Sequence, residues 1–196
     1  MNNLLATFRL YLRISKVDEI ARRYFVMNGF DGALTTLGII LGGYLVGGAD
    51  AKVILSAGIG AGMAMSISGA WGAYMAERAE RMRAIKELEE ALFSDLNNSL
   101  IDKASKMAIM VVAIVDALAP ILTTLISILP FAFVIWGLTS MDVALPVSAI
   151  LNLVTLFFLG LFLGKISRSN IMIHGIIMMT AGLVTGALVF LLTLGF

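Results

Sequence analysis

The chain has 196 residues, of which 60% are hydrophobic and only 14% are charged, and its mean hydropathy is +0.98. A soluble domain of this length has too little interior to hide so much apolar surface, so the composition excludes a soluble globular protein. The absence of cysteine excludes disulfides, thiolate metal sites and cysteine redox pairs. The net charge of +1 predicts no nucleic-acid partner.

The amino-terminal segment, residues 1–28, is amphipathic. At helical pitch, apolar side chains share one face and then, after Ser15, a second one: Leu4, Leu5, Phe8, Tyr11 and Leu12, followed by Ile14, Val17, Ala21 and Tyr24. We expect one or two amphipathic helices that lie in the cytoplasmic interface of a membrane. The alternative is a helix packed on the protein's own cytoplasmic surface.

Five later stretches have the length and apolar character of transmembrane helices. They are Phe30–Val46, Val53–Ala76, Met107–Trp136, Val143–Gly164 and Ile171–Leu194. The third is too long for one straight crossing, and because proline removes a backbone hydrogen bond we expect a kink or a break at Pro120. The predicted fold is an all-α integral membrane protein with five transmembrane helices. Its parts are the interfacial segment 1–28, the first two spans in 29–76, a cytoplasmic acidic helical segment 77–106, and the last three spans in 107–196.

The basic residues give this arrangement an orientation. Every lysine and arginine except Lys52 falls on one side of the five spans. This positive-inside pattern predicts a cytoplasmic amino terminus and a carboxyl terminus outside. The outward loops are then very short, so we expect function within the membrane, in segment 77–106, or where the two meet. The short chain favours a prokaryotic plasma membrane.

Glycines in the first two spans follow the small-xxx-small spacing that lets membrane helices approach closely. The pairs are Gly38 with Gly42, Gly43 with Gly47, and Gly58 with Gly62. This spacing predicts close helix packing, either within one subunit or across a dimer.

Two acidic residues lie in the predicted spans, where an ionisable group is costly and therefore indicates function. Asp31 is at the cytoplasmic start of the first span, where the alternative role is to cap the helix. Asp116 is in the cytoplasmic half of the third span with apolar neighbours. It is a candidate for binding a cation or a proton, and a hydrogen bond to a serine or threonine of another helix is the alternative.

Segment 77–106 carries the chain's largest group of carboxylates. Glu77 with Glu80 and Glu87 with Glu90 are at helical neighbour spacing, and such hard oxygen ligands suit divalent cations. Met63 and Met75 of the second span are candidate weak thioether ligands, although methionine is also ordinary apolar filler. Salt bridges provide the competing explanation for the glutamates, since opposite charges recur four residues apart: Glu77–Arg81, Arg83–Glu87 and Lys86–Glu90.

The first span carries the most specific motif. Phe30-Asp31-Gly32-Ala33-Leu34-Thr35-Thr36-Leu37-Gly38 resembles the Asn-Asp-Gly-Leu-Val-Thr-Thr-Phe-Gly signature of the vacuolar iron transporter family. Weaker similarity continues in three later segments: Gly72-Ala73-Tyr74 with Arg78-Ala79-Glu80, Asp116-Ala117-Leu118-Ala119-Pro120, and the glycine-lysine ending at Lys165. The resemblance covers nearly the whole chain from Arg22 onward.

The resemblance implies a five-span homodimer that exports Fe²⁺, and also Mn²⁺, from the cytosol in exchange for protons. It further implies a path along the dimer interface, lined by the first spans, with Asp31 on that path. The metal is then the transported substrate, and no cofactor is expected. Two departures from the family pattern matter: Ala73 stands where the family has a glutamate, and segment 77–106 is much shorter than the family's three-helix metal-binding domain. We hypothesise that Asp116, where the family has glycine, restores the missing carboxylate.

Three functions compete at this point. The first is a divalent-metal transporter, in which glutamates of segment 77–106 collect the metal and Asp31 passes it into the dimer interface. The second is a membrane scaffold that kept the fold without transport. The third is a membrane enzyme acting on lipid with Mg²⁺ held by the acidic segment, although no dense aspartate cluster lies in any span. We expect a transporter rather than an enzyme.

Overall fold

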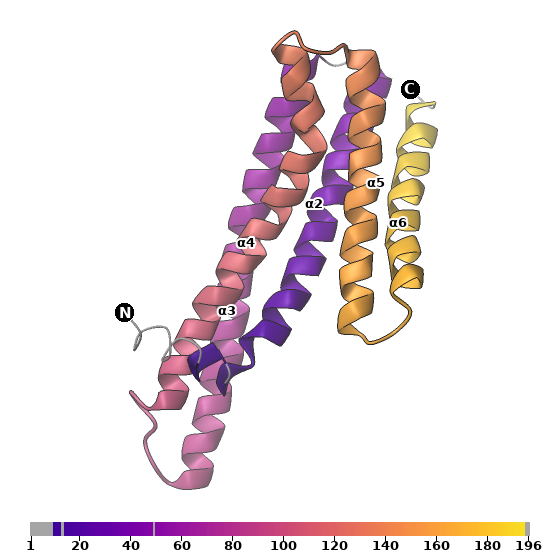
Figure 1. The fold of residues 1–196 in the computed structure, drawn as a ribbon. Coiled ribbons are helices and arrows are strands. Elements are labelled where there is room, and N and C mark those ends of the chain that lie inside the picture. The colour runs from indigo at the N-terminus through magenta and orange to yellow at the C-terminus, as the bar shows by residue number, and fades with distance from the viewer. Residues whose placement is uncertain (1–9, 13, 49, 195–196) are drawn as a thin grey trace. The chain divides into compact units, whose positions relative to one another are not determined.

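The computed structural model describes residues 10–12, 14–48 and 50–194. Over these residues the chain forms five long helices and no strand (Figure 1): α2 (Val17–Gly47), α3 (Ala51–Leu92), α4 (Leu100–Ile135), α5 (Met141–Ile166) and α6 (Ile171–Thr193). Each is long and apolar enough to cross a membrane. This confirms the predicted all-helical fold, with five helices in the described part of the chain that have the length and composition of membrane spans.

The amino-terminal segment differs from the expectation of separate interfacial helices. α2 begins at Val17 and continues into the first apolar stretch, so residues 17–28 are its first turns. The chain before it is helical at residues 10–12 and 14–15 and turns at Lys16, where φ is 49°. This left-handed backbone conformation ends one helix before the next begins. Leu4, Leu5 and Phe8 of the predicted amphipathic face lie outside the described residues.

Of the kink or break predicted at Pro120, the break is wrong, because α4 continues through Pro120 and Pro130 as one helix. Proline has no N–H to donate to the carbonyl one turn earlier, which here is that of Asp116. The hydroxyl of Thr123 donates to other carbonyls, those of Ala119 and Pro120, at 3.3 and 3.2 Å.

The chain divides into two compact units, which are described separately. The first unit contains the described residues up to Phe25 together with Ile67–Leu118. The second contains Val26–Ser66 and the described residues from Ala119 onward. The first unit therefore holds the start of α2 and the hairpin between α3 and α4, while the second holds α5 and α6.

The first unit has an apolar core of small and branched side chains. Its buried members are Val17, Ala21, Ala73, Ala108 and Val112. Tyr24 packs against this cluster from α2. Of the predicted apolar face, Val17, Ala21 and Tyr24 therefore pack on protein within this unit, whereas Ile14 is exposed.

Small residues bring the helices of the second unit close together. A Cβ atom added to Gly58 would lie 2.8 Å from Ile128, and one added to Gly62 would lie 3.1 Å from Thr124. This predicted glycine pair therefore packs α3 against α4 within one chain. Gly38, from the first predicted pair, differs from Gly58 and Gly62, because nothing lies within 4 Å of a Cβ atom added to it. That part of α2 is left open.

The second unit also contains a group of buried polar side chains that are hydrogen-bonded to one another and to the backbone. The hydroxyls of Thr36 and Thr124 are hydrogen-bonded at 3.0 Å, and the Asn152 amide donates to the Ala33 carbonyl at 2.8 Å and to the Ser127 hydroxyl at 2.9 Å. These polar side chains are at most 1% exposed. Because lipid offers no hydrogen bonds, such groups must find partners inside the protein, and here they tie α2, α4 and α5 together.

Candidate functional site

A cluster of ionisable side chains lies in the first unit, beside the apolar core. Glu77 of α3 forms an ion pair with Arg81 at 3.2 Å, and the two side chains are only 10% and 13% exposed. The Arg81 guanidinium also donates to the Ser15 carbonyl at 3.4 Å. The charges of Glu77 and Asp116 both act on the Tyr24 side chain. Asp116 itself is 2% exposed. We call Tyr24, Glu77, Arg81 and Asp116 the buried ionisable cluster.

Local sequence places these carboxylates beside the core. Glu77 follows Ala73 by one helical turn on α3, and Asp116 follows Val112 by one turn on α4. Ala73 and Val112 belong to the same core cluster, but α3 and α4 run in opposite directions (Figure 1), so Glu77 lies toward the hairpin loop and Asp116 away from it. Sequence reasoning found Glu77 and Asp116 but missed Tyr24 and Arg81 as members. The signal for Arg81 was its four-residue spacing from Glu77, and that for Tyr24 was its place on the apolar face of α2.

Arg81 is expected to be more important to stability than its neighbour Arg83. Arg81→Gln would leave the buried Glu77 carboxylate without its cation, and we expect a loss of about 3 kcal/mol in the free energy of unfolding. Arg83→Gln is the matched control, because Arg83 and Glu87 form an ion pair of the same spacing at 2.9 Å with side chains 75% and 64% exposed. That change should cost no more than about 0.5 kcal/mol. Unfolding in mixed micelles, followed by circular dichroism, measures both, and equal effects would contradict the burial argument.

The remaining glutamates of the predicted metal set lie on the surface of α3. Glu80, Glu87 and Glu90 are all exposed. Of the salt bridges that the sequence predicts, those of Glu77 and Glu87 are formed. Among the described residues no group of three histidine, cysteine, aspartate or glutamate side chains is arranged to hold a metal ion. One subunit therefore does not assemble these carboxylates into a closed metal centre.

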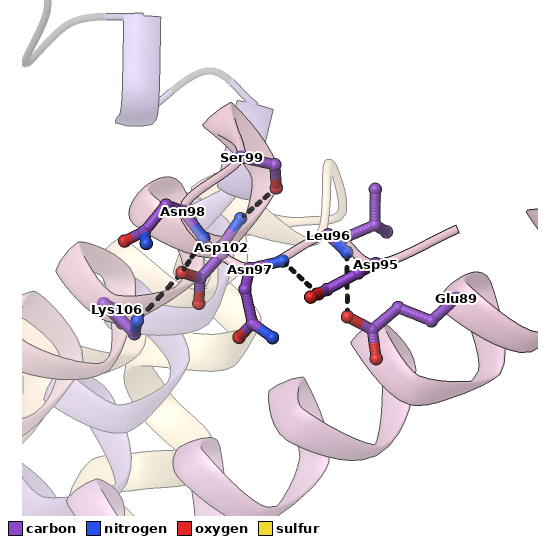
Figure 2. Close-up of polar contacts among 8 residues, drawn as sticks. All are labelled: Glu89, Asp95, Leu96, Asn97, Asn98, Ser99, Asp102 and Lys106. Carbon is purple, nitrogen blue, oxygen red and sulfur yellow. Dashed lines mark hydrogen bonds and ion pairs between the residues drawn. The ribbon is translucent and has the colours of Figure 1, made fainter.

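Other carboxylates of the hairpin stabilise its loop, residues 93–99 (Figure 2). Glu89 accepts a hydrogen bond from the Leu96 N–H at 2.9 Å, and Asp95 accepts one from the Asn97 N–H at 2.8 Å. The latter bond lowers the pKa of Asp95 below its usual value. At the start of α4, Ser99 accepts from the Asp102 N–H while the Asp102 carboxylate accepts from the Asn98 N–H, an arrangement close to a capping box. These acidic residues hold backbone donors, a structural role that the sequence analysis did not assign.

Asp31 lies in the second unit, in the middle of α2 rather than at a helix start. The alternative role of helix capping is therefore excluded, since the backbone N–H groups there are already used within the helix. The Asp31 side chain is exposed, as are those of Met27 and Thr35, one turn before and one turn after it. The structure thus places a carboxylate, a thioether and a hydroxyl along one outward face of α2.

The two predicted methionine ligands also face outward. Met63 and Met75 of α3 are 55% and 52% exposed. Neither is among the residues of the buried ionisable cluster. Within one subunit they are surface residues of an apolar helix, which is the ordinary role of methionine in such a helix.

Comparison with known proteins gives one relative of similar length. The chain is 33% identical over 181 residues to "Uncharacterized protein MJ0645" of the archaeon Methanocaldococcus jannaschii, and the match covers 91% of each chain. No protein-family model matches the chain, and no solved structure matches it.

Proposed function

The chain belongs to the same family as this archaeal protein, and we propose that it is a divalent-metal transporter that exports Fe²⁺ or Mn²⁺ from the cytosol as a homodimer. The proposed localisation is a prokaryotic plasma membrane, with the amino terminus in the cytoplasm. That orientation rests on the one-sided distribution of lysine and arginine.

The observation that carries the proposal is the outward position of Asp31. A carboxylate at the lipid-facing surface of a spanning helix costs about 3 kcal/mol or more, so such a group normally faces protein or water. Gly38 leaves the surface of α2 open two turns beyond Asp31, and close packing of a second subunit there would cover both. A path between two α2 helices would then be lined by Asp31, Thr35 and Met27, whose oxygen and sulfur atoms are suitable ligands for Fe²⁺ and Mn²⁺.

The exposed glutamates of α3 provide the entry side of the proposed path. Glu80, Glu87 and Glu90 are open to solvent, and carboxylates raise the local concentration of divalent cations by electrostatic attraction. Metal collected there would pass to Asp31 and leave on the other side of the membrane.

The buried ionisable cluster is the proposed site of proton coupling. Ala73, at the position where the vacuolar iron transporter signature has a glutamate, lies in the core cluster one turn from Glu77. Asp116 is buried near the same core and interacts with Tyr24, so it can supply the carboxylate that Ala73 lacks. A carboxylate changes its charge when it takes up or releases a proton, which is what proton coupling requires.

Substitution of Asp116 tests this coupling. Asp116→Asn has nearly the same shape but cannot exchange a proton, so we expect a pH gradient no longer to drive metal flux. Under a gradient, flux through the variant should be about tenfold or more below that of the wild type. Asp102→Asn, which removes a carboxylate of the same helix at the hairpin loop, is the control and should keep the pH response. Undiminished, gradient-driven transport by the Asp116→Asn protein would contradict the role in proton coupling.

The proposed function is tested by flux of Fe²⁺ and Mn²⁺ into proteoliposomes that contain the purified protein. Metal-dependent uptake above that of protein-free liposomes is the expected result. Absence of flux for every divalent ion, in protein shown to be folded and dimeric, would instead support the non-transporting scaffold. Mg²⁺-dependent turnover of the liposome lipids without flux would support the lipid enzyme.

A further inference from the structure

A groove with a basic rim lies between α3 and α4 in the first unit. Its volume is about 580 Å³. Tyr74, Ile109 and Met110 line one part of it, and Arg78, Lys86 and Lys106 are the basic residues of its lining. We call this cavity the basic groove. It is separate from Asp31 and from the exposed glutamates Glu80, Glu87 and Glu90, none of which lines it.

The acidic residues of the basic groove are already engaged. Glu89 accepts the backbone N–H of Leu96, and Asp102 accepts that of Asn98 while it also pairs with Lys106 at 2.8 Å (Figure 2). In the described part of the chain, neither Arg78 nor Lys86 forms an ion pair. With Arg78, Lys86 and Lys106 against Glu89 and Asp102, the lining has a net charge of +1, and its two cations on α3 are not held in ion pairs.

The position of the groove along its helices matches a membrane boundary. On α3 it extends from Tyr74, at the end of the apolar stretch, to Glu89 in the polar hairpin, a rise of about 22 Å along the helix. On α4 it extends from Asp102 to Met110, across the beginning of the apolar stretch. Tyr74, Ile109 and Met110 therefore line the hydrocarbon end, and the basic residues lie toward the water side, where Met82 and Ile85 also line the groove.

We propose that the basic groove binds the headgroup and upper acyl chains of one anionic phospholipid. The phosphate pairs with Arg78 and Lys86, and an acyl chain lies against Ile109 and Met110. Charge complementarity selects an anionic lipid, because a zwitterionic headgroup brings a cation of its own against the basic rim. The apolar lining selects a lipid over a soluble phosphate, which has nothing to place there. This site is independent of which ion the protein carries.

The test is titration of the purified full-length protein in detergent with dioleoylphosphatidylglycerol, dioleoylphosphatidylcholine or inorganic phosphate, with bound molecules counted by native mass spectrometry. The wild-type protein should retain one phosphatidylglycerol more tightly than any further one. Arg78→Gln with Lys86→Gln should weaken that first binding by about fivefold for each cation removed. Lys103→Gln with Lys165→Gln removes two cations outside the groove and is the matched control, which should bind as the wild type does. Arg78→Lys with Lys86→Arg keeps both charges and should retain most of the binding.

Three results would overturn the proposal. These are equal retention of phosphatidylcholine and phosphatidylglycerol, displacement of the bound lipid by millimolar inorganic phosphate, and equal loss of binding in the groove variant and the control variant. The comparison of the two lipids uses the wild-type protein alone, so it remains decisive if the double variant does not fold.

Discussion

Asp31→Asn is expected to reduce Fe²⁺ and Mn²⁺ flux in proteoliposomes to the level of protein-free liposomes. The amide has almost the same size, so the fold should be kept. A divalent cation that loses water in a narrow path needs a negative charge to compensate for it, and the amide has none. The thermal unfolding of the variant should be unchanged or slightly raised, since removing an outward carboxylate from an apolar helix relieves a solvation cost.

The control for this experiment lies on the same helix. Asp18→Asn also removes one exposed carboxylate of α2, but Asp18 pairs with Arg22 at 3.3 Å near the start of the helix and away from the open face around Gly38. Its flux should equal that of the wild type. If Asp31→Asn also transports at the wild-type rate, Asp31 is not on a metal path and the main support for the proposed function is lost.

Gly160→Val is expected to cause the largest loss of stability among single changes in the second unit. A Cβ atom added to Gly160 of α5 would lie 2.7 Å from the Cα of Gly175 in α6 and would also meet the backbone carbonyl of His174. α5 and α6 lie side by side (Figure 1), and backbone atoms cannot move aside as a flexible side chain can. We expect a loss of about 3 kcal/mol in the free energy of unfolding, the upper end of the usual range for overpacking.

Gly60→Val is the matched control, because nothing lies within 4 Å of a Cβ added to Gly60 of α3. Both substitutions replace a helical glycine by the same residue, so their difference isolates the contact between α5 and α6. The control should change the unfolding free energy by less than about 0.5 kcal/mol, measured in mixed micelles. An equally large loss for Gly60→Val would contradict the packing argument, since helix propensity favours valine over glycine.

Local chemistry was enough to predict the helices and several of their contacts. Apolar runs of about 20 residues identified the five long helices, because only such runs can place a hydrogen-bonded backbone in lipid. The four-residue spacing of Glu77 and Arg81 predicted their ion pair, since helical neighbours meet whatever the rest of the fold does. The spacing of Gly58 and Gly62 likewise predicted close packing, although the sequence left open which helix would be the partner.

Predictions failed where a distant part of the chain overrides a local tendency. Pro120 removes one backbone bond, which locally favours a break, but α4 continues through it and packs closely on α2 there: a Cβ atom added to Gly32 would lie 2.7 Å from the Pro120 Cα. Asp31 resembled a cap because it stands at the start of the first apolar span, yet α2 begins at Val17, whose burial in the core stabilises the earlier turns.

Composition and hydropathy predicted the class of this protein, its helices, and the residues whose charge is costly in a membrane. The surroundings of those residues depend on the folded molecule. It pairs Glu77 with Arg81 and buries Asp116, while it leaves Asp31, Glu80, Glu87 and Glu90 on the surface. The physical reason is that hydropathy and helical spacing act over a few residues. Which faces pack together depends instead on side chains far apart in the chain, such as Ala73 against Val112.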